Sequence, residues 1–257
     1  GIPNLLTGGV VAINVVSTLP AITGASTTLD RGRQTTNVGD SNAGTLGTGG
    51  TAGVGALALP AVGRPEVELR DGAGLLIGID IQASDVTVAG LAAYGFGNTP
   101  TNNAHAVVRI GATAARAIID NCVLGASASS FTDPGAGTRS AGDVLRSIGG
   151  DDGIVRNSLI GFANGSGISL AGTSDRWQIL SNEIRGNAIG NSTRDGIHIE
   201  AGATETVSGN LIANQEGCGI DAATTTGANT FDNNTVTRSG LGSGAAETPG
   251  VRVGGAT

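Results

Sequence analysis

The chain contains short alternating runs of apolar and polar residues that recur along its length. One pattern is a small residue followed by apolar–x–apolar, as in residues 196–199 (Gly-Ile-His-Ile) and 250–253 (Gly-Val-Arg-Val). A second pattern, apolar–x–Asn–x–apolar, follows the copies of the first, as in residues 180–184 (Leu-Ser-Asn-Glu-Ile). Alternation over so few residues predicts short β-strands that bury one face, and it lacks the 3.6-residue period of a helix.

The spacing of the two patterns predicts how the strands are connected. The stretch from the first pattern to the second is nearly constant, and the step from Ile197 to Asn210 is typical at 13 residues. The return stretch varies widely, from 10 residues between Asn210 and Ile220 to 24 between Asn121 and Leu145. A solenoid whose insertions are confined to one corner of each coil has this property.

These repeats resemble the right-handed parallel β-helix superfamily that includes pectate lyases, polygalacturonases and many bacterial surface proteins. Residues 13–31 resemble the entry coils of large secreted bacterial β-helix proteins. The resemblance implies an all-β chain that forms a single right-handed parallel β-helix of about eight or nine coils. Residues 1–66 are then entry coils with a long Gly/Thr-rich excursion, and residues 67–257 are regular coils of one continuous domain.

The second pattern predicts a ladder of asparagines at one tight bend of the coil. Asn tolerates the left-handed backbone conformation that such bends require, and stacked amides can bond from coil to coil. The expected ladder residues are Asn121, Asn157, Asn182, Asn210 and Asn234. The expected inward-facing residues are Ile77, Ile79, Val108, Ile110, Ile168, Leu170, Ile197, Ile199, Ile220 and Val251, with Val123, Val155, Leu159, Ile184, Ile212 and Val236.

Composition narrows the possible partners. The net charge is −7, all basic residues are Arg, and aromatic residues make up 2% of the chain. An acidic chain without a basic run lacks the clustered positive charge that binds nucleic acid. No stretch of the sequence approaches the ~20 apolar residues of a membrane span. The two cysteines, Cys122 and Cys218, form no metal motif, so no metal site is expected from them.

One column of outward positions is the expected groove if the chain binds or cleaves a ligand. In the superfamily, active sites lie on the outside of the first sheet, beside the variable loops. Mapping that pattern onto this sequence gives Arg109, Ser169, Asp195, His198, Glu200, Asp221 and Arg252, with Arg146 in a less certain register. Asp195 resembles part of the polygalacturonase signature, but the acidic pair and the Gly-His-Gly expected on later coils are missing. No catalytic residue is therefore assigned.

We expect a non-catalytic extracellular structural module, such as a bacterial sheath, filament, surface-layer or adhesin segment. A polysaccharide lyase or glycoside hydrolase acting on an acidic polysaccharide stays open, with Ca²⁺ as the one conceivable cofactor, and so does a carbohydrate-binding module. Because the last residues begin a new strand at Val251 without a polar cap, we also expect self-association or continuation into a longer chain.

Overall fold

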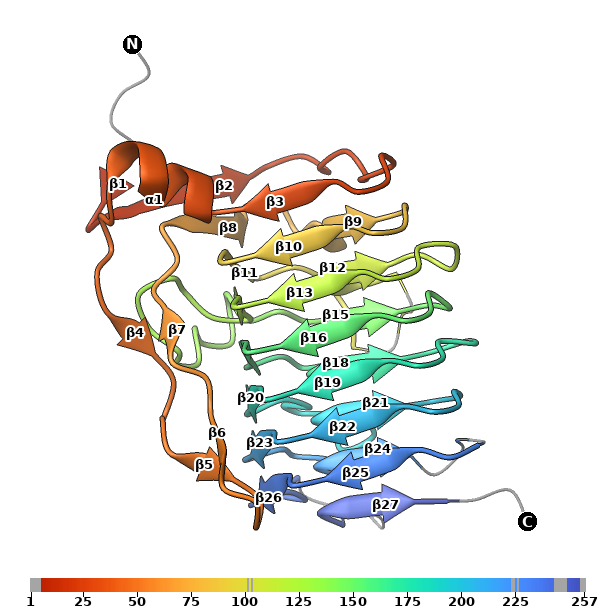
Figure 1. The fold of residues 1–257 in the computed structure, drawn as a ribbon. Helices are drawn as coiled ribbons and strands as arrows, with labels where there is room; N and C mark the ends of the chain where they lie inside the picture. Colours follow the sequence, from red (N-terminus) through yellow and green to blue (C-terminus); the bar gives the residue numbers. More distant parts are fainter. Residues whose placement is uncertain are drawn as a thin grey trace.

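The computed structural model describes residues 6–100, 102, 104–222, 225, 227–242 and 249–254. The chain winds through three stacked sheets, called A, B and C here, in the repeating order A, B, C (Figure 1). Apart from β1, their strands pair in parallel. The all-β, single parallel β-helix predicted from the repeats is confirmed. No helix in the described part of the chain is long and apolar enough to span a membrane.

The strands of each sheet follow in spatial order. Sheet A contains β1 (Leu6–Thr7), β2 (Val10–Val15), β8 (Val67–Asp71), β11 (Ala92–Tyr94), β14 (Val123–Leu124), β17 (Leu159–Gly161), β20 (Glu183–Arg185), β23 (Leu211–Ala213) and β26 (Thr235–Thr237). Sheet B contains β9 (Ile77–Ile81), β12 (Ala106–Ile110), β15 (Asp143–Ser147), β18 (Ile168–Leu170), β21 (Ile197–Ile199), β24 (Ile220–Ala222) and β27 (Val251–Val253). Sheet C contains β3 (Thr28–Asp30), β10 (Thr87–Ala89), β13 (Ile118–Asp120), β16 (Ile154–Arg156), β19 (Gln178–Leu180), β22 (Thr206–Ser208) and β25 (Thr230–Asp232).

The interior of the coil is filled by one apolar, mainly aliphatic cluster to which all three sheets contribute. Ile168 and Ile197 enter it from sheet B, Ile119 from sheet C, and Ile160 and Ile184 from sheet A, and all five are fully buried. Most residues predicted to face inward belong to this cluster. Val251 is an exception, because it lies on the last described strand of sheet B and is 45% exposed.

The prediction was wrong for Val123 and Leu159, which are buried on the other face of sheet A. They belong to a second, separate apolar cluster with Val10, Val62 and Phe131. Their neighbours Leu124 and Ile160 take the inward positions. The sheet is therefore covered on both faces here, and two adjacent apolar residues in each strand satisfy the two faces.

A long excursion near the N-terminus covers the outer face of sheet A. It follows the short helix α1 (Gly32–Val38) and pairs β4 (Thr45–Leu46) with β7 (Val62–Gly63) and β5 (Thr51–Ala52) with β6 (Leu57–Ala58). We call residues 45–63 the strap. The strap extends along sheet A as far as β26, as Figure 1 shows.

The asparagine ladder forms at the bend from sheet C to sheet A, but with fewer members than predicted. Asn182 Nδ2 donates to Asn210 Oδ1 at 3.0 Å, and Asn210 Nδ2 donates to Asn234 Oδ1 at 2.9 Å. Asn121 and Asn157 lie one position earlier, with φ of 53° and 49°. Their placement in the ladder was wrong, because the bend has two adjacent positions that both suit Asn.

The ladder position itself is occupied by other small residues in those coils. Ser158 accepts the Cys122 N–H at 3.1 Å and donates its own N–H to Asn182 Oδ1 at 3.0 Å. Cys122 is fully buried there, and burial raises the pKa of its thiol to about 11. The ladder therefore continues as a chain of side chains that accept a backbone N–H from the preceding coil.

Candidate functional site

The outer face of sheet B carries a continuous column of polar side chains. Strand register aligns, coil after coil, Asp80, Arg109, Arg146, Ser169, His198, Asp221 and Arg252. From Asp80 to Asp221, each lies between buried positions of its strand, as His198 does between Ile197 and Ile199. The structure thus places the groove residues predicted on sheet B in one column, and it adds Asp80.

Asp80 was not among the predicted groove residues, because the predicted inward residues Ile77 and Ile79 were taken to correspond to Val108 and Ile110. The observed partner of Val108 is Ile79, two residues further on. With that register, Asp80 falls opposite Arg109, and its alternation with Ile79 and Ile81 was a usable signal.

Two ion pairs at the ends of the column have bidentate geometry. Arg109 binds Asp80 through Nε–Oδ1 at 3.0 Å and Nη2–Oδ2 at 2.7 Å. Arg252 binds Asp221 through Nε–Oδ1 at 2.9 Å and also through Nη2 and Oδ2. Two parallel hydrogen bonds to a carboxylate fix a guanidinium in place. These arginines therefore join neighbouring coils.

Arg146 forms the buried centre of the column. Its side chain is 1% exposed and donates to Asp143 Oδ2 at 2.8 Å, to Ser169 Oγ at 3.1 Å and to Glu200 Oε1 at 2.9 Å. Arg194 lies 3.9 Å from the same Glu200 oxygen. Asp143 was not among the predicted residues, since it lies in a strand whose register the sequence left uncertain.

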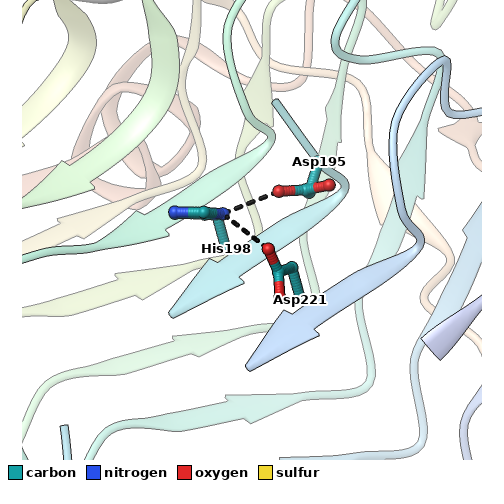
Figure 2. A group of neighbouring side chains, drawn as sticks. All are labelled: Asp195, His198 and Asp221. Atoms are coloured by element: carbon teal, nitrogen blue, oxygen red, sulfur yellow. Dashed lines mark hydrogen bonds and ion pairs between the residues drawn. The ribbon is translucent and has the colours of Figure 1, made fainter. Parts of the chain in front are cut away.

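The predicted residues Asp195, His198 and Asp221 come together in one cluster (Figure 2). His198 Nδ1 lies 2.6 Å from Asp195 Oδ2 and 3.6 Å from Asp221 Oδ2. Both carboxylates are almost fully buried, whereas the imidazole is 18% exposed. In Figure 2 the second ring nitrogen points away from both carboxylates.

Asp195 is held in place by backbone contacts with adjacent coils. Its Oδ1 accepts the Cys218 N–H at 2.8 Å, and its own N–H donates to Ser166 Oγ at 3.2 Å. Asp143 Oδ1 accepts the Ser166 N–H at 2.7 Å in the same manner. A second series of side chains that accept backbone N–H groups of neighbouring coils thus lies just before the strands of sheet B. One carboxylate oxygen of Asp195 accepts a hydrogen bond within this series, and the other oxygen is hydrogen-bonded to His198.

The surroundings of His198 favour its protonated form. Burial by itself lowers the pKa of His198, but the hydrogen bond to Asp195 and the charges of Asp195, Asp221 and Glu200 outweigh it and raise that pKa. The carboxylate also fixes the orientation of the ring. The pair is therefore arranged to hold a proton at Nδ1 and to present Nε2 outward.

The cluster offers few of the ligands that a calcium ion requires. Ca²⁺ takes six to eight oxygen ligands, whereas this cluster offers two carboxylates and one imidazole nitrogen. The Arg252 guanidinium already binds Asp221. The distance of 2.6 Å between His198 and Asp195 is that of a short hydrogen bond. The geometry suits proton sharing better than Ca²⁺ ligation.

One comparison with known proteins, the match to a family model, agrees with the architecture. A family model described as a right-handed beta helix region matches residues 77–236. No curated protein matches the chain. Among solved structures, the chain is similar to the Dettilon tailspike protein, with 10% identity and a TM-score of 0.36. That alignment covers 62% of this chain and 44% of the tailspike chain, so this chain spans less than half of that protein. The family-model match, which covers more than half of the chain, shows that the chain belongs to the right-handed β-helix family.

Proposed function

We propose that this chain is a non-catalytic structural module of an extracellular or cell-surface assembly. The observation that carries the proposal is the mutual pairing of charges along the outer face of sheet B. Arg109 pairs with Asp80, Arg146 with Asp143 and Glu200, and Arg252 with Asp221. Arg146 and Asp143 lie in the same strand, whereas the other pairs join different coils of the solenoid, as expected for a rigid structural element.

Burial strengthens this reasoning at the centre of the face. Arg146 and Asp143 are both almost completely removed from water. A buried ion pair tolerates the loss of one partner poorly, because the remaining charge has no water to solvate it. Arg146 and Asp143 are therefore poorly suited to break their ion pair in order to bind a substrate. We also propose that the protein is bacterial, and that it self-associates or continues into a longer chain.

A polysaccharide lyase or hydrolase is the second candidate function. It is favoured by the Asp195–His198 pair, whose outward ring nitrogen has the orientation required of a proton acceptor. An inverting glycosidase also needs two carboxyl groups ~6.5–9.5 Å apart with room for water. In this cluster one oxygen of each carboxylate and one imidazole nitrogen all lie within 4.8 Å of one another, which is closer than that separation.

Turnover of a polysaccharide panel separates the two candidates. The purified chain is incubated with polygalacturonate, alginate and neutral glucans, with and without Ca²⁺, and new chain ends are quantified. The proposal predicts no turnover, with self-association or elongated assemblies in sedimentation and negative-stain images. Turnover that disappears in His198→Gln, while the melting temperature is kept, would establish the enzyme instead.

A further inference from the structure

We propose that the outer face of sheet A contains a binding groove for a neutral oligosaccharide, between the strap and residues 126–139. Two adjoining hollows of ≈ 220 Å³ and ≈ 270 Å³ make up this groove. Both are lined by Phe131 and Arg185, so they are parts of one surface feature. The groove is separate from the ion-paired column on sheet B and does not depend on the function proposed for it.

The groove begins where the apolar cluster under the strap ends. Above it, Val62 of the strap and residues 126–131 pack on Val123 and Leu159 and close the outer face. At β20 the apolar residues of the sheet give way to Glu183 and Arg185, which line the first hollow with Thr45 and Thr48 of the strap. The strap and the loop therefore form two walls, and the sheet forms the floor.

Two aromatic rings form the apolar part of the groove. Phe131 and Phe162 lie with ring centroids 5.1 Å apart and planes tilted by 60°. The whole chain has only four Phe, one Trp and one Tyr. Two of these six aromatic residues line the same hollow, beside Arg185, so aromatic side chains are concentrated there. Aromatic rings with a few placed polar groups are the usual lining of a small-molecule site.

The backbone of Phe162 is an unusual place for an aromatic residue. Its φ is 57°, and the equivalent positions of the next coils hold Gly186 at 58° and Asn214 at 59°. A bulky side chain in this left-handed region is uncommon, and strained residues cluster at functional sites. Gly186 leaves the space for the ring, since a Cβ added there would lie 3.0 Å from it.

The polar part of the groove is built on a buried carboxylate. Glu183 Oε2 accepts from the Thr48 N–H at 2.7 Å and the Thr48 hydroxyl at 3.0 Å, and Glu183 Oε1 lies 3.1 Å from Arg185 Nη1. This arrangement fixes the strap and the guanidinium, while the Arg185 side chain stays 32% exposed. Asn214 and Thr132 add an amide and a hydroxyl to the second hollow.

This combination of groups matches the chemistry of a sugar. A pyranose offers an apolar C–H face, which packs on aromatic rings, and hydroxyls, which bond to planar amide and guanidinium groups. The charges within the groove balance, because Glu183 pairs with Arg185 and Asp133 pairs with Arg139. A neutral oligosaccharide is therefore favoured over a polyuronate, which would also be repelled by the net charge of −7.

Calorimetric titration of the full chain with neutral hexaoses of glucose, mannose and galactose tests the proposal, with hexagalacturonate as the acidic comparison. We expect at least one neutral hexaose to bind, and more tightly than hexagalacturonate. Phe162→Asn should weaken that binding by at least about tenfold, as for an anchor residue of a binding site. Asn suits the left-handed backbone at this position, so the variant should still fold.

Arg185→Gln should weaken binding to a similar degree. The matched control is Arg156→Gln on sheet C, another partly exposed arginine that pairs with one carboxylate, Asp120; it should bind like the unchanged chain. Absence of binding to every neutral hexaose, a preference for hexagalacturonate, or equal affinity in both groove variants would overturn the proposal. None of these results alters the turnover and sedimentation outcomes that test the role of sheet B.

Discussion

The outer faces of sheets A and B belong to the same coils but are stabilised in different ways. On sheet B, a column of polar residues lies between core residues, and Arg109–Asp80 and Arg252–Asp221 pair between neighbouring coils. On sheet A, the strap and a loop cover the face, and buried carboxylates bind the covering backbone. Glu183 binds Thr48 in this way, and Glu68 accepts the Ala128 N–H at 2.7 Å. On sheet B the ion pairs themselves occupy the outer face, whereas on sheet A the covering segments form walls around a hollow.

The largest effect is expected at the buried centre of sheet B. Asp143→Ala leaves Arg146 without its closest carboxylate in a site that excludes water. Such a change costs about 3–5 kcal/mol of the free energy of unfolding. Chemical denaturation measures it. The control is Asp85→Asn, which removes the charge of an exposed pair with Arg116 and suits the left-handed backbone at φ 61°. Equal small losses in both variants would show that the sheet B face is not held by buried charge.

The covered face of sheet A should respond to truncation like a core. Leu159→Ala removes a fully buried side chain from the cluster under the strap and should cost about 2–5 kcal/mol. Ile160→Ala, on the inner face of the same strand, is the matched comparison. A loss below about 1 kcal/mol for Leu159 alone would mean that the strap does not cover this face in solution.

Substitutions at the two adjacent bend positions between sheets C and A should change the free energy of unfolding by different amounts. Asn182→Ala removes an acceptor for the Ser158 N–H and a partner for Asn210, and it should cost about 1–3 kcal/mol. Asn157→Gly, at the exposed bend with φ of 49°, should change stability far less, because glycine readily adopts this conformation. Comparable losses at both positions would contradict the observed register.

The smallest effect is a dependence on pH that originates at His198. Its pKa is raised in the folded state, so its stabilising contribution is complete below the unfolded value of ~6.5 and is lost as the pH rises through the folded value. Relative to His198→Gln, the unchanged chain should therefore lose stability across this window. Titration of the ring by NMR measures the pKa directly, and a value below ~6.5 would contradict the account.

The repeats predicted the fold and most of the core because each strand must bury alternate residues. They also predicted the column on sheet B, where alternation is intact. Prediction failed at Val123 and Leu159, since nothing local shows that the strap covers them. It failed for Asn121 and Asn157 because two adjacent bend positions favour the same residue type. The groove on sheet A depends on contacts such as Thr48 with Glu183, which are 135 residues apart, and no repeat pattern contains that information.

Hydrogen–deuterium exchange with the tightest-binding neutral hexaose tests the contrast between the two faces most directly. Amide exchange is compared with and without the sugar, in the unchanged chain and in Phe162→Asn. The account predicts slower exchange in residues 45–48, 131–133 and 183–186 of the unchanged chain only, with residues 195–200 and 220–222 unaffected. Slower exchange around His198 and Asp221, with the strap unaffected, would place the binding site on sheet B and contradict the account.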